Sequence, residues 1–140
     1  MILLDTNVIS EVLRPIPDPA VLAWLRVIRR RELWTCSIVL AELFSGVGLM
    51  PTGKRQEALR EKMNQLVSTL FDEKILDFEV KAARAYGPIL AGRQAMGHPI
   101  SELDAQIAAI SVVNGATLAT RNIPDFQHCG IQLINPWEAL

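Results

Sequence analysis

Short apolar segments alternate with longer segments of helical periodicity along this chain, and this alternation constrains the fold more than any other feature. The short segments are typical of buried strands, and the segments between them repeat apolar residues every three or four positions. Strands that alternate with helices favour a parallel sheet with helices on both faces. We therefore predict an α/β fold, a three-layer α/β/α sandwich around a central, mainly parallel sheet, in which residues 1–140 form a single domain.

The predicted strands lie at residues 2–4, 33–36, 74–78, 117–119 and 131–134. The predicted helices lie at residues 5–14, 17–28, 38–48, 54–71, 79–96 and 102–113. Ser37 is expected to cap the third helix, Gly87-Pro88 to kink or interrupt the fifth, and Gly115 to end the last. Val21, Leu22, Leu25 and Ile28 are expected on one apolar side of the second helix, and Leu103, Ile107 and Ile110 are expected to face inward in the last.

Composition excludes several classes of protein. No apolar run approaches the roughly 20 residues that cross a bilayer, and the apolar start of the chain meets Asp5 instead of continuing as a signal peptide. We therefore expect a cytoplasmic protein without membrane contact. Cys36 and Cys129 lack the spacing of a zinc site or redox pair, so reduced structural thiols are expected. The net charge of -1 gives no general attraction to nucleic acid, so any polyanion must be drawn by a local basic surface or a bound cation.

Three acidic residues lie where a solvated side chain is not expected. Asp5 directly follows the first strand, Glu42 interrupts an apolar helix, and Asp104 lies in a helix rich in alanine and isoleucine. A buried carboxylate without a partner costs several kcal/mol, so each acid requires one. Small residues lie three, four or seven positions away on the same helical faces: Ser45, Gly46, Ser101, Ala108 and Ser111. If the acids converge, their charges repel, and a hard cation such as Mg²⁺ or Mn²⁺ would resolve the conflict.

Each acid also has an ordinary structural explanation. Asp5 could cap the helix that follows it, Glu42 could be an exposed helix position, and Asp104 could be a first-turn acid favoured by the helix dipole. These alternatives stay open when each residue is taken alone. The argument for a shared site is their joint placement, because functional groups of a parallel sheet gather where its strands end.

Several segments spread over nearly the whole chain form a specific set in this order and spacing: residues 2–11 (ILLDTNVISE), 41–43 (AEL), 104–109 (DAQIAA), 119–122 (ATRN), 125–126 (DF) and 135–137 (NPW). With these segments the chain resembles PIN-domain ribonucleases, specifically toxins of the VapBC type close to the FitB-like group. The resemblance implies a PIN-like fold with a five-stranded sheet and the hydrolysis of RNA phosphodiester bonds. It also implies a homodimer and a cognate antitoxin.

The resemblance assigns catalytic roles to Asp5, Glu42, Asp104 and Asn122, the three acids being ligands of Mg²⁺ or Mn²⁺. Thr6, Asn7 and Thr120 would support the site, and Arg121 could meet a phosphate or be an ordinary exposed arginine. Many relatives have an aspartate where this chain has Asn122, so Asp125 is a second candidate for the fourth position. Asn122 to Asp125 also resembles a local capping arrangement around Pro124.

The predicted partners are an RNA substrate, a cognate antitoxin and a second copy of the chain, with DNA contacted only indirectly through the antitoxin. The helices at residues 21–28 and 54–71 offer apolar surfaces for self-association or a partner helix, and the alternative is that both simply pack on the core of their own chain. Two other classes of function stay open. One is a non-catalytic binding module whose acids cap helices, and a weaker one is a receiver-like phospho-acceptor domain.

Overall fold

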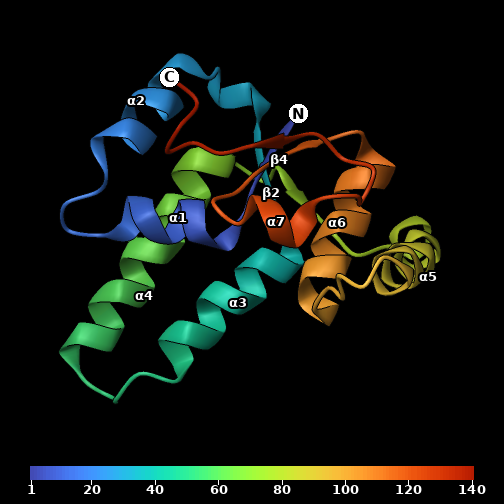
Figure 1. The fold of residues 1–140 in the computed structure, drawn as a ribbon. Helices are drawn as coiled ribbons and strands as arrows, with labels where there is room; N and C mark the ends of the chain where they lie inside the picture. Colours follow the sequence, from blue (N-terminus) through green and yellow to red (C-terminus); the bar gives the residue numbers. More distant parts are fainter.

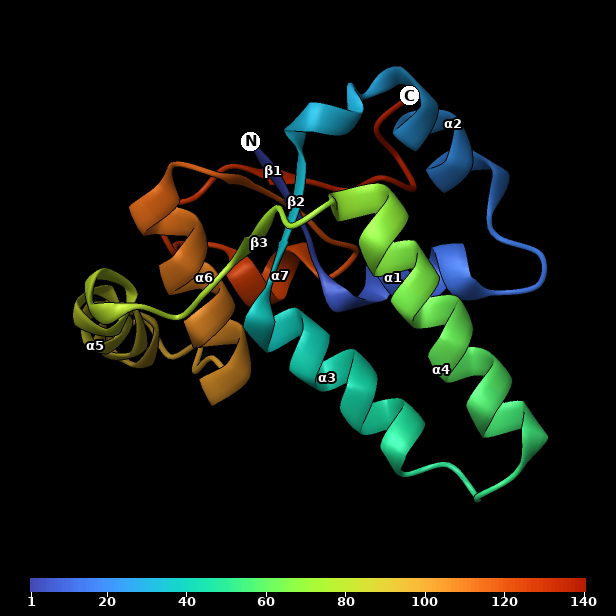
Figure 2. The same ribbon diagram turned by 180° about the vertical axis from the view of Figure 1, so that it is seen from behind.

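A five-stranded sheet forms the centre of the computed structural model, which describes all 140 residues. Its strands are β1 (Ile2–Leu4), β2 (Leu33–Cys36), β3 (Ile75–Leu76), β4 (Thr117–Ala119) and β5 (Leu133–Ile134). They follow the order β3-β2-β1-β4-β5, and every neighbouring pair is parallel. Figures 1 and 2, which view the molecule from opposite sides, show helices on both sides of this sheet. The predicted α/β/α sandwich is therefore confirmed.

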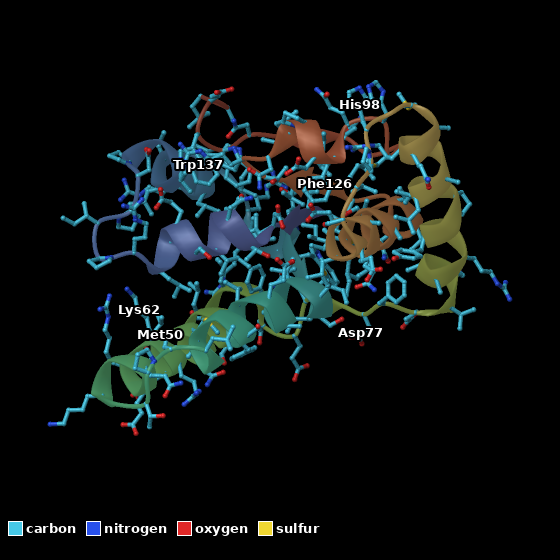
Figure 3. The ribbon with its side chains drawn as sticks, turned by 60° about the horizontal axis from the view of Figure 1, so that its bottom comes forward. Met50, Lys62, Asp77, His98, Phe126 and Trp137 are labelled. Atoms are coloured by element: carbon cyan, nitrogen blue, oxygen red, sulfur yellow. The ribbon has the colours of Figure 1, made fainter.

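Seven α-helices surround the sheet: α1 (Thr6–Leu13), α2 (Pro19–Val27), α3 (Ser37–Gly48), α4 (Lys54–Leu66), α5 (Val80–Ala95), α6 (Glu102–Asn114) and α7 (Ile123–Phe126). A 3-10 turn, η1 (Arg30–Glu32), precedes β2, and a π-helical turn, η2 (Val67–Phe71), continues α4. Figures 1 and 2 show α3 and α4 as an antiparallel pair that projects away from the sheet. Lys62 of α4 reaches α1 and donates to the Leu13 carbonyl oxygen at 2.8 Å (Figure 3). None of these helices combines the length and apolar character that a membrane crossing needs.

Local sequence determines both ends of α1. Asp5 is its N-cap, with an extended backbone and a side chain that accepts a hydrogen bond from the Thr6 amide at 2.8 Å. At the other end, Pro15 disfavours a helical conformation of the residue before it. Arg14 is accordingly extended, with ψ of 149°, and ends the helix. These boundaries agree with the prediction.

The core is built around the central strands of the sheet. Leu3, Leu4 and Leu118 are fully buried on β1 and β4. Cys36 and Cys129 are buried and unpaired, and burial raises the pKa of the Cys36 thiol to about 11. Both cysteines are thus structural thiols, as predicted.

Helix α6 ends as predicted but buries a different set of residues. Gly115 stops it in the left-handed conformation, with φ of 61°. Ile107 and Ile110 are fully buried, whereas Leu103 is 46 % exposed, so its predicted inward position is wrong. The buried residues of α6 begin at Ala105, and Leu103 lies before the helix reaches the core.

Three further helix predictions differ in detail from the structure. Ser37 is the first residue of α3 rather than its cap, because the chain passes from β2 directly into the helix. In α2, Val21 is buried and Leu25 and Ile28 pack against the core, whereas Leu22 is only half-buried and Trp24 is buried in addition. Helix α5 runs without interruption through Pro88, since both that proline and Arg84, whose carbonyl loses its partner, lie on the exposed side.

Two strands are shorter than predicted. β3 and β5 have two residues each, where the sequence suggested 74–78 and 131–134. Both are edge strands with a neighbour on one side only, so fewer of their residues join the hydrogen-bond ladder. The predicted helix at 54–71 is likewise divided into α4 and η2.

Candidate active site

The candidate site begins where β1 and β4 end at the carboxyl edge of the sheet. Leu4 and Ala119 are paired in register, and the Asp5 amide donates to the Ala119 carbonyl oxygen at 3.0 Å. Asp5 and Thr120 therefore leave the sheet side by side. This is the edge at which the sequence predicted the site.

Asp5 is 4 % exposed and accepts hydrogen bonds on both carboxylate oxygens. Its Oδ1 accepts from the Thr6 amide at 2.8 Å, and its Oδ2 accepts from the Thr120 hydroxyl at 2.7 Å and Asn7 Nδ2 at 3.1 Å. Burial raises the pKa of Asp5, and these hydrogen bonds oppose that rise. The carboxylate is thus both a helix cap and a group fixed in orientation by β4, so one expectation does not exclude the other.

Asn7 and Thr120 connect α1 to the segment that follows β4. Asn7 Nδ2 donates to the Thr120 hydroxyl at 3.1 Å, while Asn7 Oδ1 accepts from the Arg121 amide at 3.0 Å. The Thr120 hydroxyl also accepts from the Asn122 amide at 3.0 Å. Segments more than one hundred residues apart are held together by this network, and Asp5 lies within it.

A cavity of about 490 Å³ opens above this network and contains no hydrophobic lining residue. Its walls are formed by Asp5, Thr6, Asn7, Ser10, Glu11, Arg14, Glu42, Asp104, Arg121 and Asn122. The three acids singled out in the sequence therefore share one cavity, together with Thr6, Asn7, Arg121 and Asn122. Thr120 is buried beside it and Asp125 does not line it.

Glu42, on α3, and Asp104, on α6, complete the acidic wall. Both are half-buried. Glu42 Oε1 is a buried atom without a hydrogen-bond partner, and so is the Thr6 hydroxyl oxygen. Asp104 lies in the first turn of α6, and its amide donates to the Ser101 hydroxyl at 3.2 Å, so its predicted first-turn alternative is also realised. Glu42 has no corresponding role at a helix end.

The three carboxyl groups oppose one another's ionisation. Burial is the main cause that raises the pKa of Glu42, the charges of Asp5 and Asp104 raise it further, and the nearby Thr6 hydroxyl lowers it. The pKa of Asp104 is raised by burial and by the charges of Asp5 and Asp125, although the Ser101 hydrogen bond lowers it. Such mutual repulsion in a cavity is relieved when a cation binds.

The donors fit a hard divalent cation in their chemistry. They are all oxygens, and Glu42 Oε1 lacks any other partner. No three acidic, histidine or cysteine side chains are arranged to hold an ion directly. Mg²⁺ usually keeps several waters and takes only one or two protein carboxylates directly, so the remaining acids would contact it through water.

Asn122 and Asp125 differ in their relation to the site. Asn122 lines the cavity and precedes α7 without a side-chain capping hydrogen bond. The Asp125 amide donates to the Asn122 carbonyl oxygen at 3.1 Å, so the local turn is held by the backbone. Asp125 is exposed, yet its charge raises the pKa of both Asp5 and Asp104. The geometry favours Asn122 as the cavity residue, with Asp125 close by.

Ser10, Glu11 and Arg14 line the cavity but were not predicted as site residues. All three lie on α1 or at its end, in the segment that carries Asp5. Arg14 follows Glu11 by three positions and Ser10 by four, the spacings that bring side chains of one helix together. This periodicity could have identified them once Asp5 was assigned.

Several known proteins are similar in sequence to nearly the whole of this chain. A model of the family described as PIN domain matches residues 2–128. Plasmid stability protein StbB of Pseudomonas syringae is 44 % identical over 139 residues, covering 99 % of this chain and 100 % of the relative. The VapC ribonuclease Y4jK of Sinorhizobium fredii is 38 % identical, covering 99 % of each chain. Toxin FitB of Neisseria gonorrhoeae is 39 % identical, covering 98 % of this chain and 99 % of the relative.

Solved structures show the same similarity. FitAB bound to a DNA fragment superposes with a TM-score of 0.91 at 38 % identity, covering 99 % of this chain and 96 % of the other. VapBC2 of Rickettsia felis, bound to a DNA fragment from its promoter, gives a TM-score of 0.81 at 30 % identity, covering 96 % and 98 %.

Proposed function

We propose that this chain, which belongs to the PIN-domain family, is a metal-dependent endoribonuclease that hydrolyses RNA phosphodiester bonds as the toxin of a type II toxin–antitoxin pair. The observation that carries the proposal is the convergence of Asp5, Glu42 and Asp104, from three separate elements, on one polar cavity. Relatives named as a VapC ribonuclease and as toxin FitB support the reaction and the biological role.

Asp5, Glu42 and Asp104 would hold one Mg²⁺ or Mn²⁺ ion, directly or through water. When bound, the cation would lower the pKa of a water molecule and neutralise charge that builds on the scissile phosphate. Asn7 and Thr120 keep Asp5 in one orientation through their hydrogen bonds.

Two cavity residues would act on the substrate side. Asn122 offers a neutral carbonyl oxygen to the site, and Arg121 offers a guanidinium to a phosphate. The Arg121 guanidinium stacks over the Trp137 ring at 5.0 Å, which limits its motion beside the cavity.

The proposed partners follow from the same family. A cognate antitoxin would bind the chain, and DNA would be contacted through that antitoxin, because the similar FitAB and VapBC2 structures are described with bound DNA. We also propose a homodimer in the cytoplasm. Whole-chain coverage of the relatives supports a single catalytic domain over residues 1–140.

The rival function is a non-catalytic binding module whose acids cap helices. Asp5 does cap α1, and Asp104 does lie in a first turn. Glu42 distinguishes the two functions because it is half-buried and caps nothing. A binding module gains nothing from a buried carboxylate oxygen that lacks a hydrogen-bond partner, as Glu42 Oε1 does.

The test is cleavage of total RNA by the purified protein in Mn²⁺ and in EDTA. We expect cleavage only with Mn²⁺, and none by Glu42→Gln prepared in the same way. Glu61→Gln is the matched control, since Glu61 is exposed on α4 outside the cavity. Cleavage in EDTA that equals cleavage in Mn²⁺ would contradict the metal dependence, and intact RNA in every reaction would favour the binding module.

A further inference from the structure

We infer that Arg14, held in place by the buried carboxylate of Glu11, binds a phosphate of the RNA next to the scissile one. Glu11 is then a positioning residue that acts through Arg14. This inference rests on the proposed function and adds a substrate contact outside the acidic cluster. Neither Glu11 nor Arg14 belongs to the cluster of three acids proposed to hold the metal.

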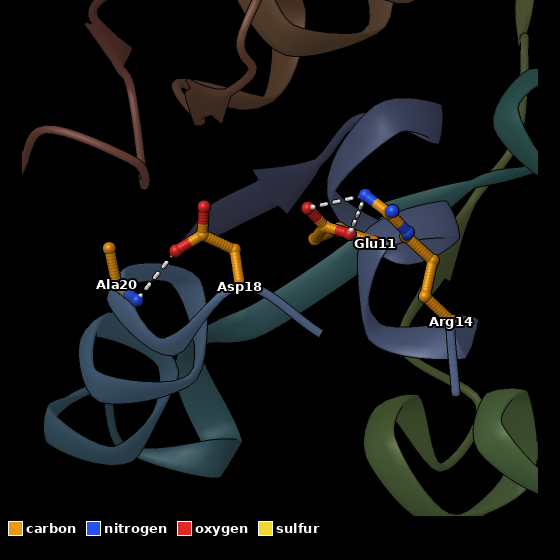
Figure 4. A network of polar contacts seen from close by, with 4 residues as sticks. All are labelled: Glu11, Arg14, Asp18 and Ala20. Atoms are coloured by element: carbon orange, nitrogen blue, oxygen red, sulfur yellow. Dashed lines mark hydrogen bonds and ion pairs between the residues drawn. The ribbon is translucent and has the colours of Figure 1, made fainter. Parts of the chain in front are cut away.

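Glu11 and Arg14 form the only ion pair in the structure. Glu11 is 5 % exposed, and its two carboxylate oxygens accept from the same atom, Arg14 Nη1, at 3.4 and 3.2 Å (Figure 4). A buried carboxylate needs a partner, and Arg14 is the sole side-chain partner of Glu11. The pair is therefore a fixed part of the cavity wall.

The pairing leaves most of the Arg14 guanidinium free. Only Nη1 donates within the chain, although a guanidinium carries five N–H donors. Arg14 is 66 % exposed. Asp18, the next acid along the chain, is occupied elsewhere because it accepts from the Ala20 amide at 2.8 Å (Figure 4). The unused Nε and Nη2 donors have the fork geometry that binds a phosphate through two hydrogen bonds.

The backbone also holds Arg14 in place. Its amide donates to the Glu11 carbonyl oxygen at 3.2 Å, and Pro15 keeps its own conformation extended. Main chain and side chain of Arg14 are thus both attached to Glu11. An arginine fixed in this way loses less conformational freedom when it binds a phosphate than a free one does.

The position of Arg14 determines which phosphate it can meet. Asp5 caps one end of α1 and Arg14 caps the other, so their Cα atoms are separated by about 13.5 Å along the helix. The scissile phosphate belongs near Asp5, and Arg14 would meet a neighbouring one. Arg121 lies on the wall near β4, so the cavity offers a bound strand a second cation besides Arg14.

Charge gives these arginines their importance. Arg14 and Arg121 are the only cationic side chains among the ten residues that line the cavity, beside four acids. The chain as a whole has a net charge of -1, so it does not attract RNA in general. Local cations at the cavity must supply that attraction.

The test measures binding of a short fluorescein-labelled single-stranded RNA of mixed sequence by anisotropy in EDTA, over a range of salt concentrations. We expect Arg14→Ala to weaken binding roughly tenfold and to reduce the slope of log affinity against log salt by about 0.7. Arg84→Ala is the matched control, because Arg84 is exposed on α5 and lines no part of the cavity. Arg14→Lys should restore the salt slope and only part of the affinity.

Glu11→Gln separates positioning from simple charge. If Glu11 only repelled RNA, its neutralisation would tighten binding. If it positions Arg14, Glu11→Gln weakens binding, and the double variant Glu11→Gln/Arg14→Ala binds no more weakly than Arg14→Ala. Arg14→Ala leaves the buried Glu11 carboxylate without its partner, and the double variant removes that charge. Circular dichroism of Arg14→Ala and of the double variant therefore distinguishes lost binding from lost folding.

Two results would overturn the inference: Arg14→Ala that binds RNA as Arg84→Ala does, or Glu11→Gln that binds more tightly than wild type. Cleavage assays in Mn²⁺ separate this failure from that of the proposed function. If the wild type cleaves RNA and Arg14→Ala cleaves it with the same KM, the inference about Arg14 is refuted and the ribonuclease function stands. Arg14-dependent binding without any cleavage by wild type refutes the ribonuclease function and leaves Arg14 as a contact for RNA.

Discussion

The Thr120 hydroxyl donates a 2.7 Å hydrogen bond to Oδ2 of Asp5, a residue 115 positions earlier in the chain. Both atoms are buried, and both residues follow paired strands directly. This bond fixes the central carboxylate of the candidate site, so its loss should affect stability and activity together.

We expect Thr120→Val, which keeps the side-chain volume, to lower the free energy of unfolding by about 1–3 kcal/mol, because Asp5 loses a partner in a buried position. Cleavage should fall about 10–100-fold, as for other groups that orient a metal ligand. The hydrogen bond lowers the pKa of Asp5, so the pH profile should move to higher pH. Thr52→Val, at an exposed loop position, is the control for urea unfolding and RNA cleavage.

Asp5→Asn, Glu42→Gln and Asp104→Asn should each reduce metal-dependent RNA cleavage by more than about a hundredfold, because each removes a charged ligand. Loss of a residue that only supports a metal ligand already lowers metal affinity or activity about 10–100-fold. Side-chain volume changes little, so circular dichroism should remain that of the wild type. Normal activity in any one of the three would remove that residue from the proposed site.

Metal-free protein should lose stability as pH rises above the ordinary carboxyl range. Glu42 has a pKa raised above 4.5 by burial and by the charges of Asp5 and Asp104. The folded state then binds more protons than the unfolded state, so unfolding becomes easier as pH passes from the unfolded to the folded pKa. Glu42→Gln should flatten this dependence and stabilise the metal-free protein above that window. The measurement is thermal unfolding in EDTA across pH. If Glu42→Gln were less stable than the wild type above that window, the charge argument would be contradicted.

Mn²⁺ should raise the melting temperature of the wild type, since a ligand of the folded state contributes about 2.7 kcal/mol at one hundred times its Kd. The same titration decides the fourth position. If Asp125 is the missing acid, Asp125→Asn should weaken the Mn²⁺ effect more than Asn122→Ala does. The reverse order would make Asp125 a residue of the turn only.

The proposed antitoxin should place an arginine or lysine close to Asp5, Glu42 and Asp104, because an acidic cavity attracts cations and a guanidinium can engage two carboxylate oxygens. Changing that basic residue of the co-encoded partner to alanine should weaken binding and relieve inhibition of RNA cleavage. Full inhibition by every such partner variant would mean that the partner covers the RNA path or alters the dimer instead.

Local chemistry explains which features could be predicted from the sequence. The strands at 2–4, 33–36 and 117–119 match β1, β2 and β4, since buried apolar runs bounded by polar residues leave little choice. Asp5 as a cap and Gly115 as a stop follow from the backbone conformations these residues favour. Glu42 was recognisable because an isolated acid in an apolar helix requires an explanation.

Only the tertiary structure decided which residues meet. Periodicity suggested that Leu103 faces the core, but the point where α6 reaches the core depends on packing, and Leu103 is exposed. The strand order, the bond from Thr120 to Asp5 and the entry of Glu11 and Arg14 into the cavity wall depend on contacts or packing beyond one element. The sequence by itself determined most of the elements and the unusual acids, because conformational preference and burial cost act residue by residue. Their assembly into a site required the fold, because convergence is a property of the packed chain.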